Sequence, residues 1–238
     1  MNKLILACAA FGAFGLTAAP AMADAITLDA SSIGTNYTLN YNGFSDGTTI
    51  SGLTGSTTFT LTGISGNDYT FGYSVSNTSS APITGSRISS FAFNTNPDIT
   101  SASSTGAFSY TTLNSNYPNG IGNVDVCFKD AATGACAGGG SGGLTIGESG
   151  TGAFTLSFSQ PISSLTLSDF YLRYQSISGA GNVTSASGAG TLTGTTSGGT
   201  TVPEPGMLGL LSLGLIGTAL LRRRRHTALI AAARPAFA

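Results

Sequence analysis

The chain has 238 residues, of which only 8% are charged, and its formal net charge at pH 7 is −1. It contains 34 glycines, no tryptophan and a single histidine. Lysine and arginine are too few outside the last segment to form a basic surface, so the composition excludes nucleic-acid binding.

Residues 1–23 have the three parts of an export signal, which is expected to be helical. A positive start is followed by an apolar stretch, and Ala21 and Ala23 form a small-residue site for signal peptidase. Cleavage after Ala23 makes Asp24 the first residue of the mature chain. A lipoprotein-type site at Cys8 is the alternative, but too few apolar residues precede it.

The exported part, residues 24–201, carries nine acidic and three basic side chains, a net charge of about −6. Apolar and polar residues alternate in several short runs, which is the period of β-strands. These runs lie at residues 37–41, 59–61, 69–75, 154–158 and 170–174. Disorder is the alternative for such a polar chain, but the periodic aromatic and aliphatic residues argue against it.

One apolar face per strand favours antiparallel sheets that pack face to face. We therefore expect an all-β fold, a single antiparallel β-sandwich of jelly-roll style, over residues 24–193. A β-solenoid is the second choice, although no fixed repeat is present. The last strand of the β-sandwich is expected to be weak and to lie at residues 186–193. A tether of Gly, Ser and Thr is expected at residues 194–201.

After signal cleavage two cysteines remain, Cys127 and Cys136. An even number in an oxidising compartment predicts one disulfide, worth about 2.5–3 kcal/mol for so short a loop. Free thiols are the alternative.

The glycine-rich residues 134–143 are expected to form a flexible loop. No metal site is expected, since the only histidine is His226.

The exported part has no histidine, so neither a Ser-His-Asp triad nor a Cys-His pair can form. Its carboxylates stand in no catalytic or calcium-binding pattern, so we expect no enzyme and no cofactor. Tyr171, next to Arg173 on the expected solvated face, is a candidate for stacking on a glycan. Ordinary cross-strand packing is the alternative for this tyrosine.

The end of the chain combines a break, an apolar run and a basic cluster. Pro203, Glu204 and Pro205 interrupt regular structure. Residues 206–221 are long enough for a marginal transmembrane helix. Four arginines follow and should hold this end in the cytoplasm, leaving residues 226–238 as a short cytoplasmic tail: Arg222, Arg223, Arg224 and Arg225.

In this order, residues 202–225 resemble the PEP-CTERM sorting signal of Gram-negative bacteria. The resemblance implies that a membrane-embedded exosortase recognises and processes the tail after export. The thirteen residues beyond the arginines depart from the usual pattern, and an ordinary C-terminal anchor is the alternative. Residues 26–29, 90–94, 152–156 and 170–176, with the two cysteines, resemble the cistern family of PEP-CTERM proteins. That resemblance implies a surface β domain with two cysteines, and no activity.

The sequence thus indicates an inner-membrane-anchored precursor that faces the periplasm and later reaches the cell surface or extracellular matrix. Two classes of function remain open. The first is a structural component of the exopolysaccharide or biofilm layer. The second is a glycan-binding module, which would need tyrosine, aspartate and asparagine side chains gathered on one surface.

Overall fold

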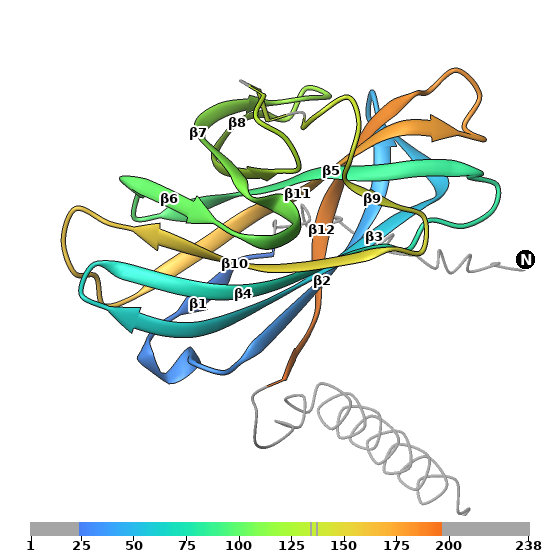
Figure 1. The fold of residues 1–238 in the computed structure, drawn as a ribbon. Helices are drawn as coiled ribbons and strands as arrows, with labels where there is room; N and C mark the ends of the chain where they lie inside the picture. Colours follow the sequence, from blue (N-terminus) through green and yellow to red (C-terminus); the bar gives the residue numbers. More distant parts are fainter. Residues whose placement is uncertain (1–23, 134, 137, 197–238) are drawn as a thin grey trace, which may run out of the picture. The chain divides into compact units, whose positions relative to one another are not determined.

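A computed structural model describes residues 24–133, 135–136 and 138–196 of the chain (Figure 1). These residues form twelve β-strands and two short 3-10 helices, and they contain no α-helix. The expected all-β fold is therefore confirmed for the described part. The elements are β1 (Ile26–Leu28), η1 (Ala30–Ser32), β2 (Asn36–Ser45), β3 (Thr48–Ser65), β4 (Asp68–Asn77), β5 (Gly85–Asn96), β6 (Ser101–Ser104), η2 (Gly106–Phe108), β7 (Tyr110–Tyr117), β8 (Gly122–Lys129), β9 (Leu144–Thr145), β10 (Ser149–Ser157), β11 (Leu165–Ser178) and β12 (Ser185–Thr196).

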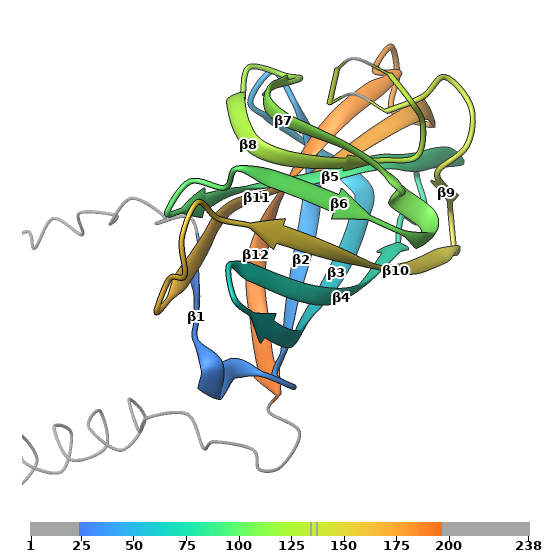
Figure 2. The same ribbon diagram turned by 60° about the vertical axis from the view of Figure 1, so that its left-hand side comes forward.

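The strands form one continuous sheet in the order β6-β10-β4-β3-β2-β12-β11-β5-β8-β7. Off this path, β1 pairs with β11 and β9 pairs with β5. The sheet curls until its two end strands, β6 and β7, lie side by side, so that it is nearly closed (Figure 2). Because the ladders connect all of the strands, the division into two facing sheets stays a prediction.

Alternation along the strands decides which side chains enter the core. In β4, the side chains at positions 69, 71, 73 and 75 are buried, while the residues between them are partly exposed. Cross-strand pairing then brings aromatic residues together: Phe59 faces Tyr73, and Phe71 faces Phe154. The rings of Phe71 and Phe154 stack with centroids 4.8 Å apart. Such pairs add about 0.5–1.5 kcal/mol beyond the burial of their apolar area.

The last strand, β12, lies in the middle of the sheet between β2 and β11. It continues to Thr196, three residues into the stretch that the sequence indicated as a tether. Its end is held by the start of the domain, because the backbone N–H of Leu192 donates to Asp24 Oδ2 at 2.5 Å. The first residue expected after signal cleavage therefore contacts the strand that leads to the C-terminal tail.

Within the described ranges, no helix is long and apolar enough to cross a membrane. Several expected segments lie outside those ranges: the signal peptide 1–23, residues 197–201 of the tether, the span 206–221 and the tail 226–238.

Candidate functional site

The structure joins Cys127 and Cys136 in the expected disulfide, with their Cα atoms 5.8 Å apart. Both cysteines are fully buried in a small cluster that also contains Ala92 and Tyr117. The hydroxyl of Ser90 donates to the carbonyl of Cys136 at 2.7 Å. The disulfide therefore fastens the segment after β8 back onto β8, and the Ser90 hydrogen bond fastens it to β5.

A buried ion pair fastens the same segment a second time. Arg87 of β5 donates through Nη1 to Asp130 Oδ2 at 3.2 Å, and both side chains are almost fully buried. Asp130 Oδ1 accepts from the backbone N–H of Gly139 at 2.7 Å. In the loop 134–143, which the sequence predicted to be flexible, the described residues Cys136 and Gly139 are thus held by the disulfide and by Asp130.

All five N–H groups of the Arg87 guanidinium have acceptors within the protein. Besides Asp130, they reach the carbonyl oxygens of Gly139 and Gly142, Gln175 Oε1 and Ser176 Oγ. Because no N–H group is left over, Arg87 holds the loop and offers no donor to a ligand.

The other two cations of the described domain are also buried. Lys129 is 1% exposed and donates to Thr112 Oγ1 and to the carbonyl of Thr133. Burial lowers the pKa of Lys129, and the neighbouring Asp130 acts in the opposite direction. Arg173 donates to Asn119 Oδ1 and a carbonyl oxygen. Among residues 24–196 that the structure describes, no lysine or arginine is exposed.

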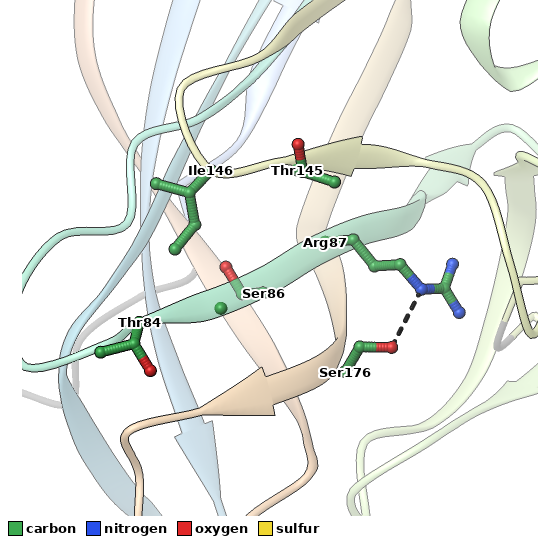
Figure 3. A pocket seen from close by; sticks show the side chains of 7 residues that line it. Thr84, Ser86, Arg87, Thr145, Ile146 and Ser176 are labelled. Atoms are coloured by element: carbon green, nitrogen blue, oxygen red, sulfur yellow. Dashed lines mark hydrogen bonds between the residues drawn. The ribbon is translucent and has the colours of Figure 1, made fainter.

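A cavity of about 390 Å³ lies next to Arg87 (Figure 3). Three parts of the chain form it: the start of β5, β9 with the residue after it, and a bulge in β11. Its lining residues are Thr84, Gly85, Ser86, Arg87, Thr145, Ile146 and Ser176. The cavity is large enough for a small ligand, and several hydroxyl groups line it.

Two local features shape this cavity. Ser176 has a φ of +53° in a register shift of β11, and its Oγ accepts from Arg87 Nε at 3.3 Å. Beyond the cavity, the Glu148 carboxylate accepts from the backbone N–H of Thr145 at 2.8 Å. The hydrogen bonds from Thr145 lower the pKa of Glu148.

The glycan candidate Tyr171 lies on β11 and is half-buried. Its ring packs against Tyr117 with centroids 5.5 Å apart, so packing between strands accounts for it. Burial raises the pKa of the Tyr171 hydroxyl, and Asp169 raises it further. The expectation that Arg173 shares a solvated face with Tyr171 is wrong, since the β7–β8 turn and β12 bind the guanidinium.

On the same strands as Tyr171 and beside them, Asn94, Asp125 and Asp169 form a hydrogen-bond network that the sequence did not indicate. The Asn94 side chain donates to Asp169 Oδ2 at 3.0 Å and accepts from the backbone N–H of Asp125 at 3.1 Å. In the described ranges, no group of three or more His, Cys, Asp or Glu side chains could hold a metal ion.

The residues of the sorting signal lie outside the described part of the chain: Pro203, Glu204, Pro205, Arg222, Arg223, Arg224 and Arg225. Ala21 and Ala23 of the signal peptidase site also lie outside it, whereas Asp24 lies inside.

Comparison with known families places a match at this C-terminal segment. Residues 201–225 match the PEP-CTERM protein-sorting motif, which confirms the predicted signal. Comparison with curated proteins and with solved structures gives no match. The likeness of the body to the cistern family stays a prediction.

Proposed function

We propose that the chain is an exported protein that an exosortase processes through residues 201–225, and that it then becomes a structural component of the exopolysaccharide or biofilm layer. The match of residues 201–225 to the PEP-CTERM motif carries this proposal. The motif implies an exported protein that is sorted to the cell envelope or surface. The structural role is the further step proposed here.

The chemistry of the tail supports processing at the membrane. The prolines at positions 203 and 205 disfavour helix, so the chain there suits the extended form that a protease binds. The four arginines favour the cytoplasmic side and oppose passage of the tail through the membrane. The apolar run between them is short and contains glycine, which weakens it as a permanent anchor.

The end of β12 limits where processing takes place. Six residues, 197–202, separate Thr196 from Pro203. Six residues span at most about 20 Å even when fully extended. The exosortase therefore has to act close to the folded domain, whose last strand lies inside the sheet and is hydrogen-bonded to Asp24.

The described domain suits a long-lived surface component. One continuous sheet, a buried disulfide and a buried ion pair hold it together. Its outer positions carry mainly hydroxyl side chains, such as Thr38 and Thr58, which pair across β2 and β3. A glycan-binding module is the second candidate, and the cavity beside Arg87 favours it.

The sorting part is tested by replacing both Pro203 and Pro205 with alanine. We expect the variant to accumulate in the inner membrane, while a Pro161→Ala control, changed at an exposed proline of the domain, reaches the extracellular polymer fraction. Equal amounts of both variants in that fraction would contradict the proposal. The structural role predicts that deleting the gene weakens the cohesion of the purified polymer layer.

A further inference from the structure

We propose that the cavity beside Arg87 binds one or two units of a neutral saccharide. The inference rests on the glycan-binding candidate above and does not depend on the sorting signal. Three observations carry it: the charge around the cavity, the hydroxyl groups that line it and its size.

The charges around the cavity favour an uncharged ligand. Arg87 is the only cation that lines it, and each of its N–H groups already has an acceptor in the protein. An anionic sugar would therefore bring a carboxylate to a site without a free cationic donor, next to Glu148, which contacts the lining residue Thr145. Removing a carboxylate from water without a partner is costly.

The hydroxyl groups at the cavity are available for a sugar. Thr84, Thr145 and Ser176 are exposed, and they come from three separate parts of the chain. Ser176 Oγ accepts from Arg87 Nε, so its own proton remains to be donated elsewhere. Ile146 and the threonine methyl groups provide apolar contacts for the C–H groups of a sugar ring (Figure 3).

The backbone of Ser176 supports a role beyond packing. Its positive φ of 53° is a conformation that glycine adopts without strain and that serine adopts rarely. The bulge in β11 turns this residue out of the regular ladder, and bulges recur next to binding sites because they redirect a side chain. Here the redirected hydroxyl meets both Arg87 and the cavity.

The size of the cavity sets the expected affinity. About 390 Å³ lies at the low end of the range for ligand sites, which begins near 300 Å³. A monosaccharide that binds with ordinary ligand efficiency then has a Kd on the order of 1 mM. Tight binding would require a longer chain of sugars that extends onto the surrounding surface.

The test uses the processed protein, purified from cells grown with ¹⁵N, and follows amide shifts by NMR. The probes are methyl glycosides of glucose, galactose and mannose, N-acetylglucosamine, and glucuronate as the anionic comparison. We expect at least one neutral probe to shift the amides of residues 84–87, 145–146 and 176, with glucuronate at least about tenfold weaker.

Two matched variants locate the binding. Thr145→Trp fills the cavity from an exposed position and should weaken the neutral probe by at least about tenfold. Thr151→Trp, at an exposed position of β10 away from the cavity, should leave the Kd unchanged. Both spectra report directly whether each variant is folded.

Several results would overturn the inference. They are the absence of shifts with every neutral probe, tighter binding of glucuronate, and equal binding by the two tryptophan variants. Shifts centred on Asn94, Asp169 and Tyr171 would place a saccharide site on the outer side of β5 and β11 instead. None of these results would affect the sorting signal, whose failure appears only in the processing of the tail.

Discussion

Replacing Asp130 with alanine should be among the most damaging single changes in the domain. The Asp130 and Arg87 side chains are only 3% and 8% exposed, and the change leaves the guanidinium buried without its counter-ion. Breaking a buried pair by removing one partner costs about 3–5 kcal/mol. The carbonyl acceptors of Gly139 and Gly142 remain, so we expect a loss near the lower end, about 3 kcal/mol.

The assay is urea and thermal unfolding at pH 7, followed by circular dichroism with the disulfide intact. For a domain of this size, about 3 kcal/mol corresponds to a fall in Tm of roughly 6–12 °C. A control, Asp98→Ala at an exposed loop position, should change stability by no more than about 0.5 kcal/mol. In the double variant Arg87→Met, Asp130→Ala, the loss should be smaller than the sum of the single losses by about 1–3 kcal/mol. Additive losses, or a loss below about 1 kcal/mol for Asp130→Ala, would refute the reasoning.

Three further predictions concern the described domain. Gly106→Ala should cost clearly more than the roughly 1–2 kcal/mol of left-handed strain, since its Cβ would lie 2.2 Å from a backbone oxygen. Gly120 has a similar φ and open space around it, so Gly120→Ala should lose only the stability that the left-handed strain costs. Equal losses for the two variants in urea unfolding would contradict this prediction. Burial raises the pKa of Tyr41, Tyr117 and Tyr174, so these groups keep their protons in the folded protein. The unfolded chain releases them near pH 10, so stability is fully present below about pH 10 and falls above it by up to about 1.4 kcal/mol per pH unit for each tyrosine. Tyr174→Phe should make that fall less steep in alkaline unfolding curves, and an unchanged slope would count against the assignment. Reducing the disulfide should lower the free energy of unfolding by about 2.5–3 kcal/mol, and a midpoint that does not move would show that the bond contributes nothing.

The strands were largely predictable because alternation is a local property. The runs at residues 69–75 and 154–158 became β4 and β10, and their aromatic residues pack in the core. The central position of β12 was not predictable, because it depends on β2, far away in the sequence, as well as on the preceding strand β11. The Gly-rich composition indicated a weak final strand, whereas β12 lies between two partners and continues to Thr196.

The candidate sites likewise divide into those that the sequence predicted and those that depend on contacts between distant segments. The disulfide followed from counting cysteines and from the destination of the chain, and the sorting motif followed from residue order alone. The role of Arg87 could not be seen, because its acceptors come from separate segments at positions 130, 139, 142, 175 and 176. The cavity forms where residues 84–87, 145–146 and 176 meet, so no local sequence pattern predicts it.

The most direct test of the account is the mass of the two ends of the mature protein. We expect protein from cells with an active exosortase to begin at Asp24 and to lack Arg222, Arg223, Arg224 and Arg225. Protein from cells without that enzyme should begin at the same residue and retain the arginines. Recovery of the same full-length C-terminus from both strains would show that residues 201–225 do not act as a processing signal in this chain.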